Sequence, residues 1–156
     1  MAVAIKQQGF TNIILYNGGL YDWIRSGGEL VSIEKLPDRK ATFISRDTLF
    51  SKINEADKRN CIDEKGEPLL TLLDFRTSLN NPVKIGNDHY AINSVCKTIH
   101  VLLDDFINKP ELIQTIPKSG EVITISETGN RDDYLIRFLY ASGYENVVGL
   151  RFGIRG

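Results

Sequence analysis

Six polar residues between a predicted strand and a predicted helix are the part of this sequence best suited to chemistry. They read Ser126-Glu127-Thr128-Gly129-Asn130-Arg131, and we call them the site loop. Gly129 can adopt the positive φ of a tight turn, and such a turn can direct successive backbone N–H groups toward one point. With the guanidinium of Arg131, these groups would attract a small anion. An ordinary connection between a strand and a helix explains the same residues equally well.

The segments on either side must position this loop. Residues 122–125 are β-branched and follow a Lys-Ser-Gly turn signal, which favours a buried strand. Residues 132–143 begin with two acids, carry apolar side chains at helical spacing and end in glycine, which predicts a helix. Residues 69–76 form a nearly continuous apolar run, typical of a parallel strand covered on both faces. Because strands alternate with helices along the chain, the sequence predicts an α/β fold with a parallel sheet.

The site loop resembles the active-site region of rhodanese-like sulfurtransferase domains. In that family a strand leads into Cys-x-x-Gly-x-Arg, a helix follows, and Gly-aromatic-x-Asn-Val comes after the helix. The matching residues here are Ile125, Ser126, Gly129, Asn130, Arg131, Gly143, Tyr144, Asn146 and Val147. The resemblance implies a rhodanese-like three-layer fold, in which helices flank a central, mostly parallel sheet of about five strands.

Ser126 departs from the family at its catalytic position. The resemblance implies a cysteine thiolate there, which accepts a sulfane sulfur as a persulfide while the loop amides stabilise the charge. A serine hydroxyl is not ionised near neutral pH, needs a positioned base to act as a nucleophile, and cannot hold a persulfide. We therefore expect a catalytically silent rhodanese-like domain with a binding or regulatory role, as part of a tandem-rhodanese sulfurtransferase. Its expected ligand is a small anion such as sulfate or thiosulfate, held by residues 127–131.

Two residues at the end of a strand are expected to support the loop. Leu73, Asp74 and Arg76 resemble the Leu-x-Asp-x-Arg signature of the family. For Asp74 the simpler interpretation is an ion pair at the strand end that organises hydrogen bonds of the loop. Arg76 is expected to face the bound anion. Residues 77–93, where the family pattern is lost, are predicted to form a long polar loop.

Two other functions remain open. An active sulfurtransferase could use Cys96 or Cys61, although neither lies on the site loop. An anion-binding module related to phosphatases is the second alternative. The related phosphatases have one more residue between cysteine and arginine than the four that separate Ser126 from Arg131. Glu127 and the two acids after Arg131 would also place negative charge at the mouth of the loop and oppose phosphate.

Composition and the two cysteines limit the other possibilities. With a formal net charge of −1 there is no reason to expect nucleic acid as a partner, and no apolar run is long enough to span a membrane. No cofactor is indicated, and two histidines without a Cys-x-x-Cys do not make a metal site. The predicted location is the cytoplasm. Cys61 and Cys96 are then expected to be free thiols, with a disulfide left open, and Cys96, next to a lysine, is the better candidate for a reactive thiol.

The two ends of the chain repeat each other. Residues 9–14 match residues 143–148 at an offset of 134, without a gap. We interpret residues 1–36 as the C-terminal remnant of a preceding rhodanese-like repeat, with a short strand at 12–16 and a helix at 20–26. Residues 37–156 would be a rhodanese-like domain that lacks its last helix. The expected partners are a protein or a neighbouring repeat, and the helix at 20–26 could dock within its own chain or form a domain-swapped dimer.

Overall fold

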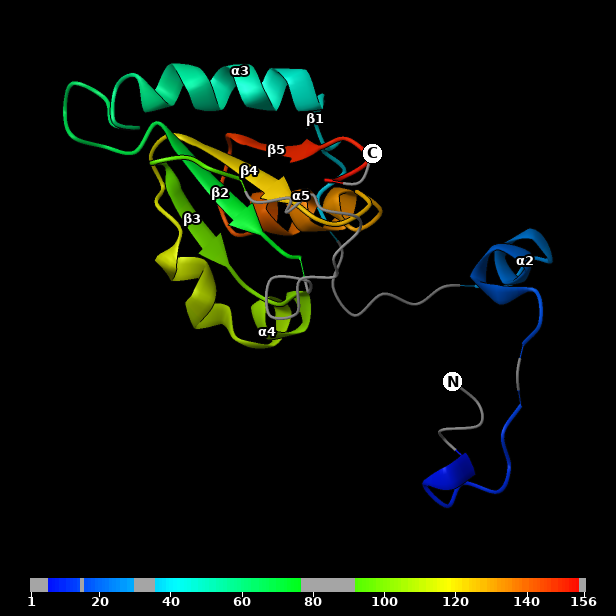
Figure 1. Cartoon of the computed structure of the whole chain (residues 1–156). Helices are drawn as coiled ribbons and strands as arrows, with labels where there is room; N and C mark the ends of the chain where they lie inside the picture. Colours follow the sequence, from blue (N-terminus) through cyan, green and yellow to red (C-terminus); the bar gives the residue numbers. More distant parts are fainter. Residues whose placement is uncertain (1–5, 15, 30–35, 77–91, 155–156) are drawn as a thin grey trace, which may run out of the picture. The chain divides into compact units, whose positions relative to one another are not determined.

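A five-stranded parallel sheet forms the centre of residues 36–156 (Figure 1). The computed structural model describes residues 6–14, 16–29, 36–76 and 92–154. The strand order is β1-β5-β4-β2-β3, and each pair of neighbours is parallel. The strands are β1 (Phe43–Ile44), β2 (Leu70–Asp74), β3 (Lys97–His100), β4 (Glu121–Ile125) and β5 (Val147–Leu150). The predicted α/β class, with a central parallel sheet of about five strands, is confirmed.

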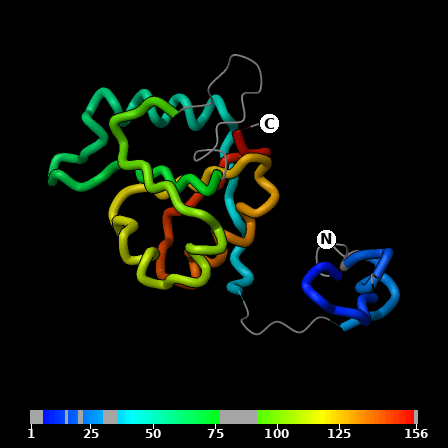
Figure 2. Tube along the Cα trace, turned by 60° about the horizontal axis from the view of Figure 1, so that its bottom comes forward, coloured from blue at the N-terminus to red at the C-terminus, as the bar shows by residue number. Residues whose placement is uncertain are grey.

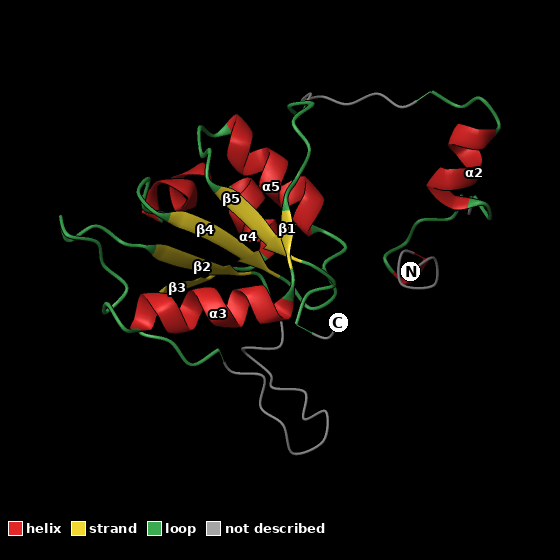
Figure 3. Cartoon of the chain, turned by 90° about the horizontal axis from the view of Figure 1, so that it is seen from above, coloured by secondary structure: helices red, strands yellow, loops and turns green. Residues whose placement is uncertain are grey.

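Helices cover both faces of this sheet (Figures 1 and 3). One face carries α3 (Arg46–Asp57), and the other carries α4 (Leu103–Asn108) and α5 (Asp132–Ala141). A short 3-10 helix, η2 (Pro110–Thr115), follows α4. The hydroxyl of Ser45 accepts a hydrogen bond from the N–H of Thr48 at 3.1 Å, so α3 begins with the serine cap that its sequence predicts.

Two apolar cores result, one on each side of the sheet. Leu72 and Ile123 pack toward α3, whereas Leu73 and Val122 pack toward α5. Successive side chains of a strand point to opposite faces, so a strand buried on both sides must be apolar throughout. This explains the nearly continuous apolar run around β2, all five residues of which are buried.

The strand register gathers three connections at one edge of the sheet. Asp74, the last residue of β2, is paired with His100 of β3 and with Ile125 of β4. The residues that follow these strands therefore lie together, at the carboxyl edge where open α/β sheets bind their ligands. The predicted loop over residues 77–93, which follows β2, falls largely outside the described residues.

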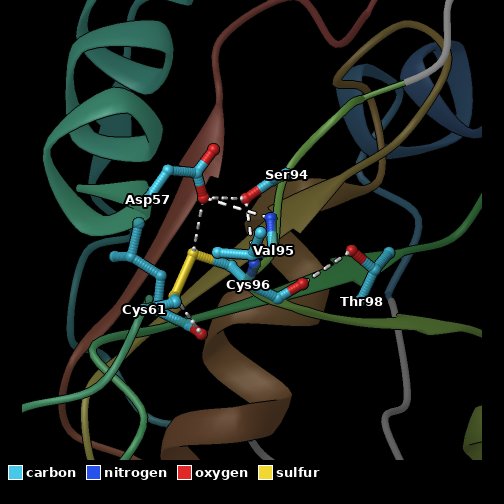
Figure 4. Close-up of a disulfide and its surroundings, with 7 residues drawn as sticks. Asp57, Cys61, Ser94, Val95, Cys96 and Thr98 are labelled. Carbon is cyan, nitrogen blue, oxygen red and sulfur yellow. Dashed lines mark hydrogen bonds between the residues drawn. A yellow bond between two sulfur atoms is a disulfide. The ribbon is translucent and has the colours of Figure 1, made fainter. Parts of the chain in front are cut away.

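The expectation of free thiols is wrong. Cys61 and Cys96 form a disulfide with a Cα–Cα distance of 5.1 Å (Figure 4). Cys61 follows α3 and Cys96 precedes β3, and the parallel pairing of β2 with β3 brings the two positions together across 35 residues of chain. A sequence separation of that size conceals the contact, because it depends on the register of two strands. Cys96 is therefore not a reactive thiol in this structure.

Residues 1–35 form a separate compact unit, coloured blue in Figure 2. Its helix α2 (Gly19–Arg25) agrees with the predicted helix at 20–26. The indole N–H of Trp23 donates to the carbonyl of Glu29 at 3.0 Å, and the ring of Tyr16 packs edge-on against Trp23. The predicted strand at 12–16 is wrong, since the described residues of that segment form no strand. A strand needs a hydrogen-bonded neighbour, and the described part of this unit contains no other strand.

Candidate functional site

The site loop connects β4 to α5 and is held in place by the chain that follows β5. Figure 2 shows this C-terminal segment beside the loop. The N–H of Ile154 donates to the carbonyl of Ser126 at 2.9 Å. Gly129 has a φ of +78°, and a Cβ added there would lie 2.8 Å from the backbone nitrogen of Phe152. Only glycine satisfies both the left-handed backbone and this close approach, so the loop has a fixed shape.

The hydroxyl of Ser126 lies inside the turn and makes two hydrogen bonds. Its Oγ accepts the N–H of Gly129 at 2.9 Å and lies 2.8 Å from Oδ2 of Asp132. An N–H group can only donate, so the hydroxyl proton is free to be donated to the carboxylate. Ser126 is only 7% exposed. Ser126 therefore ties the loop to the first residue of α5.

Asp132 is the functional candidate that the sequence analysis placed wrongly. It was expected at the mouth of the loop, but it is completely buried beneath it. Burial raises the pKa of the Asp132 carboxyl, and the hydroxyls of Ser126 and Thr124 lower it by smaller amounts. Its Oδ1 makes no hydrogen bond of good geometry within the described residues, nor does Oγ1 of Thr124. An acid in the first turn of a helix is normally solvated and interacts favourably with the helix dipole. The sequence therefore gave no indication that Asp132 is buried.

A cavity of about 400 Å³ opens beside the loop. The loop lines it with every residue except Gly129, and an apolar wall faces them. That wall consists of Phe75, Leu102, Leu103 and Leu135. The charged residues of the lining are Arg131, Asp104 and Glu127. The cavity is large enough for a small molecule, and its charge is mixed.

Three backbone donors of the loop remain available to a ligand. The N–H groups of Thr128, Asn130 and Arg131 donate to no acceptor in the described part of the chain. All three residues are exposed and line the cavity. Unpaired amides at the start of a helix favour an anion, and the guanidinium of Arg131 adds a positive charge. The amide cradle expected from the sequence stays a prediction.

Asp74 and Arg76 form a buried ion pair at the end of β2. Oδ2 of Asp74 lies 2.6 Å from one terminal guanidinium nitrogen of Arg76, and Nε of Arg76 lies 2.9 Å from Oδ1. The exposed fractions are 1% for Asp74 and 5% for Arg76. Arg76 borders a second cavity of about 370 Å³, together with His100 and Lys109. Leu102 lines both cavities. The support of the loop by Arg76 stays a prediction.

Neither cysteine contributes to this site. The register places Cys96 level with the start of β4, on the α3 face of the sheet. Ser126 lies five residues farther along β4, which corresponds to about 16 Å at 3.3 Å per residue. Within the described residues, no group of three or more histidine, cysteine or acidic side chains could hold a metal ion.

Comparison with known proteins gives structural similarities only. No family model matches this sequence, and no curated protein matches it. The crystal structure of SSP1007 from Staphylococcus saprophyticus is 16% identical, with a TM-score of 0.48, over 74% of this chain and 93% of that protein. An NAD-dependent persulfide reductase from A. fulgidus is 18% identical, with a TM-score of 0.42, over 69% of this chain and 18% of the reductase. At these identities and TM-scores, the two similarities assign neither a family nor an activity to the chain.

Proposed function

We propose that residues 36–156 form a rhodanese-like domain that does not transfer sulfur and serves a binding or regulatory role. The observation that carries this proposal is the hydroxyl of Ser126. It occupies the position of the family nucleophile, and it is hydrogen-bonded to Gly129 and to the buried carboxyl of Asp132. Oxygen cannot hold a persulfide, and the sulfur atoms of both cysteines are joined to each other. The chain therefore has no thiolate with which to accept sulfur.

A small anion of the size of sulfate or thiosulfate is the proposed ligand of the loop cavity. The unpaired N–H groups of Thr128, Asn130 and Arg131 and the Arg131 guanidinium favour it. Asp104 and Glu127 in the lining oppose it, and so does the carboxyl of Asp132 beneath the loop. Because the acidic groups outnumber the single guanidinium, binding should be weak.

The partners suggested by the sequence repeat belong to the same proposal. A neighbouring rhodanese-like repeat or another protein would receive or present the ligand, and a domain-swapped dimer is the alternative arrangement. Sedimentation analysis of the full chain distinguishes a monomer from a dimer directly. Within the described residues, no helix is long and apolar enough to cross a membrane.

Sulfur transfer from thiosulfate to cyanide tests the loss of activity. We expect the wild-type chain to give no rate above a buffer blank, because Ser126 cannot form a persulfide. Ser126→Cys places a thiol inside the same turn and should gain a measurable rate. Ser51→Cys, an exposed position on α3, is the matched control and should gain none. A wild-type rate that disappears in a Cys61→Ala, Cys96→Ala double variant would contradict the proposal.

Titration with sulfate tests the ligand. The amide resonances of residues 129–131 should shift at millimolar sulfate, and Arg131→Ala should abolish the shift. Arg59→Ala removes an exposed arginine next to the disulfide-bonded Cys61 and should leave the titration unchanged. Equal shifts in all three proteins would show that sulfate does not bind at the loop.

A further inference from the structure

The Cys61–Cys96 disulfide joins the segment after α3 to the start of β3 (Figure 4). We propose that this bond forms while the domain folds, by exchange with a disulfide-donating thiol oxidoreductase in an oxidising compartment. It then remains as a permanent crosslink that holds the edge strand β3. The alternative is a redox-active pair that cycles between dithiol and disulfide in the folded protein.

Burial of both cysteines argues against such a cycle. Cys61 and Cys96 are each 4% exposed, and both belong to the apolar core between α3 and the sheet. Thiol–disulfide exchange requires an attacking thiolate to reach one of the sulfur atoms. The packed core leaves no approach for a partner protein. The bond must therefore form before this core has closed, and it is protected afterwards.

The environment of Cys96 supports the same conclusion. Oδ1 of Asp57 accepts hydrogen bonds from the hydroxyl of Ser94 at 2.7 Å and from the N–H of Val95 at 3.1 Å, and it lies 3.7 Å from the sulfur of Cys96 (Figure 4). A disulfide sulfur has no proton to donate, so this last approach is a contact. A carboxylate this close to the sulfur also repels the negative charge of an attacking thiolate.

The carboxylate of Asp57 also helps to bring the two cysteines together. Asp57 is the last residue of α3, where the helix dipole disfavours a negative charge. Its hydrogen bonds to the chain at Ser94 and Val95 hold the approach to β3 against the end of α3, independently of the sulfur atoms. This arrangement places Cys96 opposite Cys61 and favours their pairing.

The crosslink secures an element that has few other supports. Among the described strands β3 is at the edge of the sheet and pairs with β2 alone, and its residues are exposed or partly exposed. It leads directly to Leu102, Leu103 and Asp104, which form one wall of the loop cavity. Fixing the start of β3 therefore supports that wall from the far edge of the sheet.

The proposed reaction is a complete exchange. The two cysteine thiols lose two protons and two electrons and form one disulfide, while the disulfide of the oxidoreductase is reduced to a dithiol. Disulfides persist where the redox environment is oxidising, whereas the cytoplasm predicted from the sequence keeps thiols reduced. The pairing of Cys61 with Cys96 therefore points to maturation outside a reducing cytoplasm.

Mass spectrometry with a thiol-specific label tests the origin of the bond. The full chain is produced once in an oxidising compartment and once in a reducing cytosol, and each sample is denatured and labelled without reductant. The first should stay unlabelled and be lighter by two hydrogen atoms than the fully reduced chain. The folded oxidised chain should also resist reduced glutathione, and denaturant should abolish that resistance. Labelling of both cysteines after oxidative production, or rapid reduction of the folded chain, would overturn the proposal.

Hydrogen exchange tests the role of the crosslink in β3. In a Cys61→Ala, Cys96→Ala variant, the amides of β3 should lose protection by about tenfold or more relative to those of β4. Wild-type chain that is reduced under denaturing conditions and refolded serves as a second sample, which covers the case that the variant does not fold. Equal protection of β3 with and without the bond would show that the crosslink does not hold this strand.

Discussion

One hydroxyl and one buried carboxyl determine the chemistry available at the site loop. The hydroxyl of Ser126 donates a hydrogen bond to the carboxylate of Asp132, and the oxygen of that hydroxyl accepts a hydrogen bond from the N–H of Gly129. Through these two hydrogen bonds the hydroxyl stabilises the turn. Asp132 in turn lies in a fully buried place where ionisation is unfavourable.

The buried acid makes stability depend on pH. Burial raises the pKa of Asp132 above its ordinary value of 3.8, so the folded state binds this proton more tightly than the unfolded state. The stabilisation from protonation is full below the unfolded pKa and is lost as the pH rises through the folded pKa. Asp132→Asn cannot ionise, and its amide oxygen can still accept from Ser126. We expect it to unfold a few degrees higher than wild type at pH 7, with the difference disappearing below pH 4.

Thermal unfolding at a series of pH values checks this expectation. Asp133→Asn is the matched control, because Asp133 is the next residue of α5 and is exposed, at 3.7 Å from Arg137. The control should show no comparable dependence on pH. A variant at position 132 that is less stable than wild type by the same amount at every pH would indicate that the carboxyl contributes mainly through its hydrogen bonds.

Two elements far apart in sequence fix the shape of the loop. The turn after β4 and the segment after β5 approach so closely at Gly129 that a side chain would meet backbone atoms of Phe152 and Gly153. Backbone atoms cannot move aside as the end of a flexible side chain can. The rigidity of the loop therefore comes from this contact as well as from its own hydrogen bonds.

Gly129→Ala should destabilise the domain more than an equivalent change elsewhere. Gly66 has a similar φ, +81°, but a Cβ there meets no atom within 4 Å, so Gly66→Ala isolates the cost of the backbone conformation. That cost is about 1 kcal/mol, and the clash at Gly129 should add about 1–3 kcal/mol. Urea unfolding measures both variants. Equal losses would show that the C-terminal segment yields and does not confine the loop.

The disulfide should contribute more than any single hydrogen bond near it. Closing a loop across 35 residues is worth about 4 kcal/mol in the chain-entropy description. We expect a Cys61→Ala, Cys96→Ala variant to lose stability of this order in urea. Ser94→Ala removes one hydrogen bond to Asp57 and should cost only about 1 kcal/mol. Similar losses in the two proteins would contradict this estimate of the crosslink.

At the scale of the whole molecule, the sheet and both cores lie within residues 36–156. We therefore expect a chain without residues 1–35 to keep its far-UV circular dichroism per residue and to unfold cooperatively. Failure to fold would contradict the division into two units. A lower melting temperature would instead support the docking, and fewer chains per particle would support the swapped dimer that the repeat suggests.

The sequence alone determined the class of fold and the position of the candidate site. The patterns at 69–76 and 122–125 predicted buried strands, and Ser45 predicted the start of a helix. The site loop was predicted to lie between a strand and a helix. These signals are local, because hydrophobic periodicity, caps and turn residues act within a few positions of the chain. The serine at position 126, where the resemblance implies a cysteine, was equally visible.

Only the tertiary structure decided which distant groups meet. The pairing of Cys61 with Cys96 depends on the register between β2 and β3, and the burial of Asp132 depends on how α5 packs under the loop. The short strand expected at 12–16 did not form, since strand formation requires a neighbour that a local pattern cannot supply. Contacts of this kind join residues that are far apart in the chain, and local sequence signals do not specify them.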